Sequence, residues 1–551
     1  MTNKFRSPIF ELSHDYVSQS AALSPIAATS LGISGYNHLL DDFSLSGTQR
    51  SADLTKRTLA ALTLLDPIDE IDQVAKAVLE ERMRSSLALH DSRERHILWN
   101  VIASPVSRIR QVFELMPKES AVDIEAITAR MHAVGQAHDS WTGAIEELAH
   151  AGKLTAKRQV IAIAQQLATF SKGAYTNIAN KIDPSGKNTE LHIAAKAAEA
   201  SCAKTSEWLT STYLPLANPV DAVGEERYAL WSRFFTGSNL NLKQTYEWGL
   251  EDLARIHDRM WKVVASIKPT ATSLREVADH LEQDERYIVH GEENLLRKLS
   301  SFIEESVRSL DGVYFDIDER IKNCEARLAP QGAAAAPYYM GPSEDLSRPG
   351  TTWYPTLGKT KFGWWHIVST WYHEAVPGHH LQVATVAVEK ERLSRFQRSS
   401  TFISGHGEGW ALYAERFMDE LGAFDDPGLE MGYLSAQAMR ATRVVIDIGM
   451  HLGYTNPAGK LWNAETGLQA LIEQALVNED FARSEIDRYL GWPGQAIAYK
   501  VGERVWMRAR EDAKNRLGGK FDIKSFHNYA LKLGPMGLDS LESTLANWTA
   551  K

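Results

Sequence analysis

The residues best suited to chemistry in this chain are concentrated in the stretch 370–382, which reads T-W-Y-H-E-A-V-P-G-H-H-L-Q. His373 stands beside Glu374, and His379 and His380 follow within the same stretch. Imidazole nitrogens are common zinc ligands in hydrolases, and a glutamate beside a ligating histidine serves those enzymes as general base. The stretch therefore predicts a zinc-dependent hydrolase in which Glu374 takes the proton from water.

A second stretch, at 408–415, reads E-G-W-A-L-Y-A-E and supplies a carboxylate. Two imidazoles and one carboxylate make up a catalytic zinc site that leaves one position open. We predict that His373, His379 and Glu408 bind one Zn²⁺ per chain. Glu415 lies seven residues after Glu408 on the same face of the expected helix, and it is either the rival for the ligand role or a partner behind the ligands.

The spacing of these histidines differs from the H-E-x-x-H pattern, in which two imidazoles one turn apart share a metal. Pro377 stands where the second histidine would be, and His379 and His380 come six and seven residues after His373. On a straight helix His380 would share the face of His373 but lie about 10 Å further along the axis. Bonds of roughly 2 Å from both rings to one ion would then be impossible.

Pro377 and Gly378 offer a way around this problem. Proline has no N–H for the helix ladder and clashes with the carbonyl of the residue four positions earlier, whereas glycine accepts unusual dihedral angles. We expect a bulge or kink at 375–378 that brings His379 into the position of the second ligand. His380 would then turn away and act behind the ligands.

Two resemblances support this interpretation. The run E-G-W-A-L-Y resembles the N-E-G-F-A-x-Y segment that carries the third zinc ligand of aminopeptidase N-like gluzincins, although Gly407 stands at its first position. The chain as a whole resembles the bacterial family catalogued as domain of unknown function 885. That family's pattern includes H-E-A-x-P-G-H-H-L-Q, E-G-W-A-L-Y-x-E, R-x-V-V-D-x-G-x-H and P-G-Q-A-x-x-Y, which are found here at 373–382, 408–415, 443–451 and 493–499, the third with one internal change. The resemblance is tight in the C-terminal part and implies a gluzincin-type zinc metallopeptidase whose substrates are poorly defined.

A helix expected at about 428–452 carries Arg443, Asp447 and His451 at successive positions of one stripe. On an otherwise apolar helix such groups do not face a plain core without partners. We interpret Asp447 as orienting a zinc-ligating imidazole from behind, and Arg443 as holding Asp447 or a substrate carboxylate. The alternative is a buried structural ion-pair network.

The segment 493–499 reads P-G-Q-A-I-A-Y and suits a helix start, because proline is tolerated in the first turn. Gln495 and Tyr499 would stand one turn apart, both able to face a cleft and contact substrate. Gluzincins use a phenol to hydrogen-bond the oxyanion formed on the substrate carbonyl. The resemblance therefore indicates Tyr499 for this role, with Tyr489 as second candidate and His451 as a further group that could stabilise the same charge.

The fold class expected from the pattern is mainly α. From about 48 to 310, apolar residues recur at helical spacing, with breaks at prolines and glycines. We expect residues 1–310 to form a mainly helical lobe that covers the metal cleft. Residues 311–551 would form the metal-binding catalytic lobe, within one continuous zincin-like unit that has a central cleft and a small extended segment near the metal helix.

Residues 311–362 have a different composition. The run V-Y-F-D-I-D at 313–318 alternates as a strand does, and a stretch rich in glycine, proline and aromatic residues follows. By analogy with zinc peptidases of similar build, Ala334–Tyr339 or Gly350–Tyr354 would bind a substrate backbone by strand addition. Arg348, between these segments, would pair with a substrate carboxylate. An ordinary structural loop is the alternative.

Composition narrows the range of partners. The chain has 551 residues, 44% hydrophobic and 24% charged residues, and a net charge of −10, so neither nucleic acid nor an anionic membrane surface is expected as a partner. Two cysteines are too few for a disulfide framework. The sequence shows no apolar signal core and no run of about twenty apolar residues, and a cytoplasmic location is therefore expected. The oligomeric state is open between monomer and homodimer.

Taken together, these features predict a zinc metallopeptidase. Helical lobes would restrict access, which favours short peptides as substrates. Arginines near the cleft would favour a carboxypeptidase or dipeptidase, whereas an acidic pair there, such as Asp41 and Asp42, would favour an aminopeptidase. Two alternatives remain, namely a zinc amidohydrolase acting on a small non-peptide amide and a non-catalytic helical protein that keeps a metal for stability.

Overall fold

The computed structural model describes residues 5–329, 336–343 and 346–550. Helices make up most of this part of the chain and the strands are few and short, so the mainly α class predicted from the sequence is confirmed. Its contacts divide the chain into two compact units that are interleaved in sequence. The first unit comprises Met1–Ile68, Met83–Val223 and Asp487–Trp492, and the second comprises Asp69–Arg82, Gly224–Ile486 and Pro493–Lys551.

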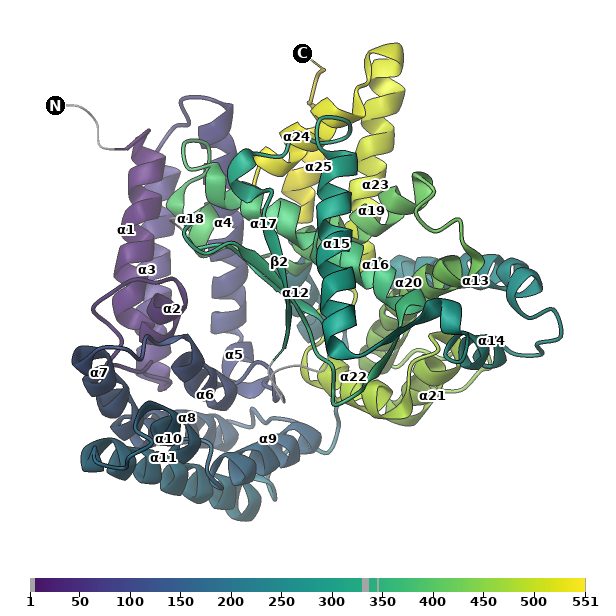
Figure 1. The fold of residues 1–551 in the computed structure, drawn as a ribbon. Helices are drawn as coiled ribbons and strands as arrows, with labels where there is room; N and C mark the ends of the chain where they lie inside the picture. The colour runs from purple at the N-terminus through teal and green to yellow at the C-terminus, as the bar shows by residue number, and fades with distance from the viewer. Residues whose placement is uncertain (1–4, 330–335, 344–345, 551) are drawn as a thin grey trace. The chain divides into compact units, whose positions relative to one another are not determined.

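The first unit is helical throughout its described elements. Its core contains the rings of Trp99 and Trp141, which meet edge to face with centroids 5.2 Å apart. Its elements are α1 (Pro8–Leu23), α2 (Pro25–Ser30), α3 (Leu45–Thr63), the later part of α4 (Glu70–Asp91), α5 (Glu94–Ile97), α6 (Pro105–Leu115), α7 (Ala121–His132), α8 (Val134–His150), α9 (Lys157–Phe170), α10 (Thr176–Ile182), α11 (Thr189–Trp208) and the π-helical turn η1 (Leu209–Tyr213). These helices are drawn in purple and blue in Figure 1.

The second unit contains every residue that the sequence singled out for metal binding. The helices at 224–310 also belong to this unit, whereas the sequence suggested a boundary near residue 310. Its helices are α12 (Gly224–Thr236), α13 (Leu242–Ile267), α14 (Leu274–Leu281), η2 (Glu285–Tyr287), α15 (Glu292–Leu310), η3 (Glu319–Ile321), α16 (Trp364–Glu374), α17 (His379–Val388), α18 (Arg395–Ser399), α19 (Ser404–Glu420), α20 (Pro427–Leu452), α21 (Ala464–Gln474), α22 (Glu479–Gly491, whose end belongs to the first unit), α23 (Ala498–Leu517), η4 (Gly518–Lys520), α24 (Ile523–Lys532) and α25 (Leu538–Ala546).

In the part of the second unit that the structure describes, two small sheets accompany these helices. Their strands are β1 (Ile288–His290), β2 (Cys324–Leu328), β3 (Tyr338–Met340), β4 (Gly350–Tyr354) and β5 (Lys361–Gly363). β1 pairs with β5 antiparallel, while β4 lies between β2, its parallel partner, and β3, its antiparallel partner. Cys324 is opposite Gly350 in the parallel pair. Figure 1 shows β2 beside the long helix α15, which packs against it.

The alternating run 313–318 does not form one of these strands. Gly312 has a positive φ of 74°, and its N–H donates to the carbonyl of Phe315 at 2.7 Å, so the chain turns back on itself here. The ring of Phe315 then stacks on His527 with centroids 4.6 Å apart. The alternation therefore reflects two side chains, Phe315 and Ile317, that enter the core from a turn, and the next strand after this run begins at Cys324.

The boundaries of α20 follow from its terminal residues. Pro427 occupies the first turn, and the carboxylate of Asp426 accepts hydrogen bonds from the N–H groups of Gly428 and Leu429. Gly453 ends the helix in the left-handed conformation, with φ 69°. The helix expected at about 428–452 is thus confirmed.

Four helices form the buried centre of the second unit. α16 packs against α19 and α20, and α19 packs against α23. The crossing of α19 and α23 needs glycine, since a Cβ on Gly502 would lie 2.0 Å from the carbonyl oxygen of Gly405 and 2.6 Å from the Cα of Gly409. This close approach brings the start of α19, with Glu408, near the start of α23, with Tyr499. Within the described residues, no helix combines the length and the apolar character needed to cross a bilayer.

Candidate metal centre

The helix that carries the histidines is interrupted at the predicted place. α16 ends at Glu374 and α17 begins at His379, so residues 375–378 separate two helices where a bulge or kink within one helix was expected. Gly378 passes so close to the preceding turn that a Cβ would lie 1.9 Å from the carbonyl oxygen of His373. The break at Pro377 and Gly378 is therefore confirmed.

The break lets two imidazoles meet one carboxylate. The rings of His373 and His379 stand perpendicular, with centroids 4.7 Å apart. The Nε2 atoms of both rings lie 3.3 Å from the same oxygen, Oε2 of Glu408. The three ligand atoms of this group all lie within 4.8 Å of one another, and the side chains are 4%, 11% and 13% exposed.

This arrangement fits a tetrahedral cation. Ligand atoms bound at about 2.0–2.1 Å in tetrahedral geometry stand about 3.3 Å apart, and the two Nε2–Oε2 distances of 3.3 Å have this value. Burial alone would raise the pKa of Glu408, but hydrogen bonds from His373 and His379 lower it well below its usual range. The carboxylate is therefore anionic, and two nitrogens with one oxygen form a donor set that suits Zn²⁺.

His380 does not belong to the ligand group. Its Nε2 donates to the carbonyl of Ile321 at 2.7 Å, and its Nδ1 lies 3.0 Å from the hydroxyl of Tyr339. Because a carbonyl oxygen only accepts, Nε2 carries the proton and Nδ1 accepts from the phenol. Burial lowers the pKa of His380 to about 4, so the ring is neutral. Its bonds join β3 and the segment before β2 to α17, next to the second ligand.

Glu415 lies behind His373. Its Oε1 is 2.8 Å from Nδ1 of His373 and 3.3 Å from Nη2 of Arg440, and its Oε2 accepts from the hydroxyl of Ser369. Burial would raise the pKa of this carboxyl, but the charge of Arg440 and these hydrogen bonds lower it. An anionic Glu415 holds the proton of His373 on Nδ1, which leaves Nε2 free to bind a cation. Of the two rival carboxylates, Glu408 is the one in the ligand group.

Glu374 is buried beside the ligands without being one of them. It is the last residue of α16, and it lies close enough to His379 and Glu408 to interact electrostatically with both. Desolvation by burial raises the pKa of its carboxyl to about 8, and the nearby charge of Glu408 adds to this effect while His379 opposes it. At a pKa of about 8 this carboxyl is mostly protonated at neutral pH, and a cation held beside it would favour the ionised form, in which it could serve as a general base.

Tyr499, near the start of α23, lies next to the centre. Its ring is nearly parallel to that of His373, at an interplanar angle of 19° and a centroid distance of 6.3 Å. The guanidinium of Arg443 lies over the Tyr499 ring, 4.8 Å from its centroid. Both Nε and Nη2 of Arg443 donate to Oε2 of Glu485, at 3.2 and 2.7 Å. The charge of Arg443 thus faces a buried carboxylate of the protein, a different partner from the substrate carboxylate or Asp447 expected from the sequence.

Asp447 also differs from its expected role. Its Oδ2 accepts hydrogen bonds from the Tyr228 hydroxyl at 2.7 Å and from the Gly494 N–H at 2.9 Å. Its other oxygen lies 3.8 Å from Nε2 of His451, whose ring packs on Tyr228 at 5.6 Å. The imidazole near Asp447 is therefore that of His451, which is fully buried and outside the ligand group. The partner of a ligand imidazole is Glu415, on a different helix.

Three further residues predicted to contact the substrate lie outside the ligand group, namely Gln495, Arg348 and Tyr489. Gln495 is buried directly after Gly494, on the segment that leads to Tyr499. Arg348 is exposed in the loop before β4, and its backbone pairs with Ser343. Tyr489 belongs to the first unit.

The two segments proposed for strand addition differ in the structure. Gly350–Tyr354 is β4, which has strand partners on both sides and cannot accept another. Ala334 and the residue after it lie outside the described residues. Tyr338–Met340 is β3, at an edge of the sheet, and Tyr339 connects it to His380 on α17.

Some residues of the centre were missed by sequence reasoning. Ser369 stands one turn before His373 on α16, and Arg440 stands one turn before Arg443 on α20, so their positions on the helix faces were available as a signal. Tyr228 carried no comparable signal, because its partner Asp447 is 219 residues away in the chain.

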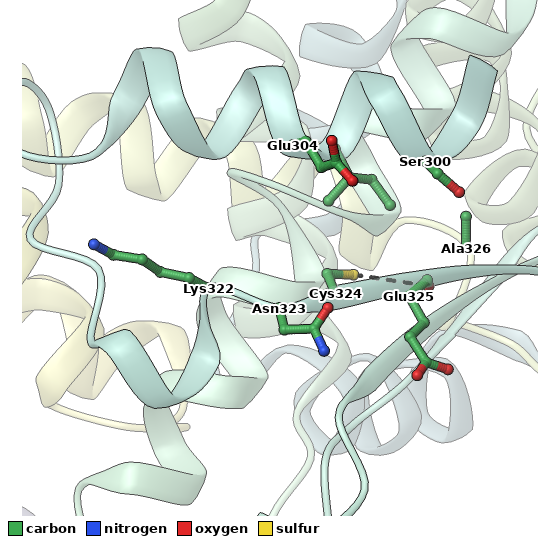
Figure 2. A pocket seen from close by; sticks show the side chains of 8 residues that line it. Ser300, Glu304, Lys322, Asn323, Cys324, Glu325 and Ala326 are labelled. Atoms are coloured by element: carbon green, nitrogen blue, oxygen red, sulfur yellow. Dashed lines mark hydrogen bonds between the residues drawn. The ribbon is translucent and has the colours of Figure 1, made fainter. Parts of the chain in front are cut away.

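A cavity elsewhere in the second unit does not involve this centre. It has a volume of about 240 Å³. Figure 2 shows it between α15 and the start of β2, with Glu304, Lys322 and Cys324 among its lining residues. Burial raises the pKa of the Cys324 thiol to about 12, so the cavity offers no thiolate nucleophile at neutral pH. The residues that could carry out a reaction converge at His373, His379 and Glu408.

Comparison with known proteins gives the fold and the family. No curated protein matches this chain significantly. A candidate lipoprotein from Colwellia psychrerythraea has a similar structure, with a TM-score of 0.85, 22% identity and 98% of each chain covered. A candidate lipoprotein of unknown function from Shewanella oneidensis is similar with a TM-score of 0.77 and 18% identity over 98% of this chain and 100% of that one. At these identities the likeness concerns the fold. A family model described as bacterial protein of unknown function (DUF885) matches residues 25–545, and the chain therefore belongs to this bacterial family.

Proposed function

We propose that this protein is a zinc-dependent hydrolase that cleaves amide bonds, with short peptides as its substrates. The observation that carries the proposal is the convergence of His373 Nε2 and His379 Nε2 on Oε2 of Glu408, each at the 3.3 Å spacing of tetrahedral ligands. These three residues would hold the cation. Glu374, buried beside them and outside the ligand set, distinguishes a reactive centre from a purely structural one.

Zinc, when bound, supplies a Lewis acid that makes water more acidic and polarises a carbonyl group. Glu374 accepts the proton that the attacking water loses as its oxygen bonds to the carbonyl carbon. The same carboxyl then delivers this proton to the amide nitrogen, so that the C–N bond breaks and a neutral amine leaves. Glu374 is ionised again once it has given up this proton, and the new carboxylic acid loses the second proton of the water to solvent, so the products are a carboxylate and an amine.

Glu415 and Tyr499 complete the centre. The hydrogen bond of Glu415 to Nδ1 of His373 fixes which nitrogen of that ring is free, and Arg440 and Ser369 hold the Glu415 carboxylate in place. The ring of Tyr499 lies beside His373, and its hydroxyl would donate a hydrogen bond to the substrate oxygen on which negative charge develops. The burial of His451 against Tyr228 gives no support to the same role for that histidine.

Peptides are favoured over other amides by the edge strand. β3 lies at the edge of a sheet that His380 joins to α17, and an extended peptide can add to such an edge. The preference for a carboxypeptidase or dipeptidase, in contrast, loses the support of Arg443, because Glu485 already neutralises its charge. We therefore propose peptide cleavage without assigning the end of the peptide that is recognised.

The test uses the full chain freed of metal with a chelator and then reloaded with Zn²⁺. The panel consists of an unblocked tripeptide, its N-blocked and C-amidated forms, and a small aryl amide. We expect one Zn²⁺ per chain, cleavage of at least one peptide only after reloading, and a kcat lower by about 10²–10⁴ in Glu374→Gln with zinc still bound. Zinc binding without hydrolysis of any compound, or equal rates for Glu374→Gln and the native protein, would refute the proposal.

A further inference from the structure

Arg443 and Asp447, one turn apart on α20, both contact the segment that carries Tyr499. Asp447 Oδ2 accepts the N–H of Gly494 at 2.9 Å, at the beginning of that segment. The guanidinium of Arg443 lies 4.8 Å from the centroid of the Tyr499 ring, at its end. α20 therefore contacts the segment at two points, namely the backbone of Gly494 and the ring of Tyr499.

The backbone contact is enclosed on both sides. Gly494 has a φ of 76°, and a Cβ there would lie 2.7 Å from the Cα of Ser232 on α12. The same helix supplies Tyr228, whose hydroxyl donates to Oδ2 of Asp447 at 2.7 Å. Asp447 is fully buried. Its carboxylate therefore holds the turn at Gly494 between α12 and α20, with two donors on one oxygen.

The guanidinium that makes the ring contact is itself held by Glu485. Glu485 receives two hydrogen bonds from Arg443, so the guanidinium plane has little freedom to turn. A planar guanidinium packed on an aromatic face restricts the position of that ring. The ring in question also lies 6.3 Å from the ring of His373, a metal ligand in the proposed function.

We infer that Asp447 and Arg443 are positioning residues that set the backbone and the ring of Tyr499 against the metal centre. The inference rests on the proposed function, because it takes Tyr499 as the group that contacts the substrate oxygen. The inference gives the stretches 443–451 and 493–499 one shared role, in which the first positions the second. A displacement of about 1 Å at such a group can lower the rate on the order of 10²-fold.

A double-mutant cycle tests the inference on the zinc-loaded full chain, with the unblocked tripeptide as substrate. Asp447→Ala removes the acceptor, whereas Asp447→Asn keeps a carbonyl oxygen that can accept both hydrogen bonds. We expect Asp447→Ala to lower kcat on the order of 10- to 100-fold with little change in KM or zinc affinity, and Asp447→Asn to restore most of the loss. In a Tyr499→Phe background, Asp447→Ala should cost less than about twofold, because the group that it positions is already disabled.

Hydrogen exchange supplies a readout that does not need activity. Asp447→Ala should lose amide protection in a peptide spanning 490–500 and keep it in a peptide spanning 404–415. Asp419→Ala is the matched control, since it removes a partly buried carboxylate that bonds Arg259 in the same unit and does not touch the Tyr499 segment. This control should leave the protection of 490–500 and the kcat within about twofold of the native values.

The outcomes separate the two proposals. If the native protein hydrolyses nothing, the proposed function fails, and the exchange experiment alone decides whether Asp447 fixes the segment. If hydrolysis is present but Asp447→Ala lowers kcat by the same factor with and without the Tyr499 hydroxyl, the inference is overturned. Unchanged exchange at 490–500 overturns it as well. Should Asp447→Ala fail to fold, Arg443→Met/Glu485→Met, which removes the guanidinium from the Tyr499 ring together with its buried partner, gives the same decision in the same two backgrounds.

Discussion

Two buried polar groups of the second unit invite comparison. The first is the ligand group His373, His379 and Glu408, and the second is the stripe of Arg443, Asp447 and His451 on α20. Both consist of ionisable side chains that are almost inaccessible and surrounded by apolar helices. From the sequence alone, the first group was predicted to bind the metal, and the second either to orient a ligand and hold a carboxylate or to form a structural ion-pair network.

The two groups differ in the hydrogen-bond and ion-pair partners of their polar atoms. Asp447 Oδ2 meets two donors, and Arg443 meets the carboxylate of Glu485, so the stripe is stabilised by partners that the protein itself supplies. In the ligand group, by contrast, two imidazole nitrogens converge on a single oxygen of Glu408 at 3.3 Å. We take convergence at the spacing of metal ligands, more than burial or charge, as the mark of the proposed cation site. The experiments below break or sharpen this contrast.

The largest effect is expected when a ligand is removed. His379→Ala should lower zinc affinity by more than the roughly 10–100-fold that loss of an outer partner costs, and hydrolysis should disappear with the metal. The matched control is its neighbour, His380→Ala, which breaks the bonds to Ile321 and Tyr339 but leaves the ligand group complete. Chelator competition measures both affinities. Zinc loss in the His380 variant together with retention in the His379 variant would reverse the assignment.

The stripe should respond in stability and leave zinc affinity unchanged. Arg443→Met removes the cation that bonds the buried carboxylate of Glu485 and should lower the free energy of unfolding by about 3–5 kcal/mol. Replacing both partners in Arg443→Met/Glu485→Met also removes the buried carboxylate and should recover part of this loss. Urea unfolding measures the stability, and zinc affinity should stay within about twofold of the native value. A drop in zinc affinity comparable to that of His379→Ala would make the stripe part of the metal site.

Glu415 connects the ligand group to a partner behind it, and its effect should be intermediate. Glu415→Gln removes the negative charge that faces Nδ1 of His373, so zinc affinity should fall by about 10–100-fold. Glu420→Gln, on the same helix but paired with Arg510, is the control and should leave the affinity unchanged. An unaltered affinity in Glu415→Gln would mean that the orientation of His373 is set by packing alone.

The sequence predicted what depends on local chemistry. Pro377 and Gly378 forced an interruption of the helix because their backbone properties act within one turn. The ends of α20 followed from Asp426, Pro427 and Gly453 for the same reason. The convergence of the two histidines with Glu408 was inferred from the break and then appeared in the structure.

The partners of buried charges could not be obtained in this way. Asp447 bonds Tyr228, 219 residues away in the chain, and Arg443 bonds Glu485, 42 residues away. Helical spacing placed Asp447 and Arg443 on one face but gave no information about which helix would cover that face. The prediction of a strand at 313–318 was wrong for a related reason, because an alternating pattern becomes a strand only if a neighbouring strand pairs with it.

The smallest effect is expected outside both groups, at Arg348. This side chain is exposed in the loop before β4, and its guanidinium contacts only the adjacent carbonyl of Pro349, at 3.5 Å, among the contacts of the described residues. Arg348→Ala should change the free energy of unfolding by less than about 0.5 kcal/mol and leave zinc affinity unaltered. If Arg348 bound a substrate carboxylate through water-exposed contacts, the gain would be at most about 1 kcal/mol, or roughly fivefold in KM. The ratio of KM between the unblocked and C-amidated tripeptides should therefore change by no more than this factor. A larger change confined to the unblocked peptide would mean that the loop closes over the substrate, and recognition of the carboxylate would then belong to an exposed arginine, with the buried Arg443 left to hold Tyr499.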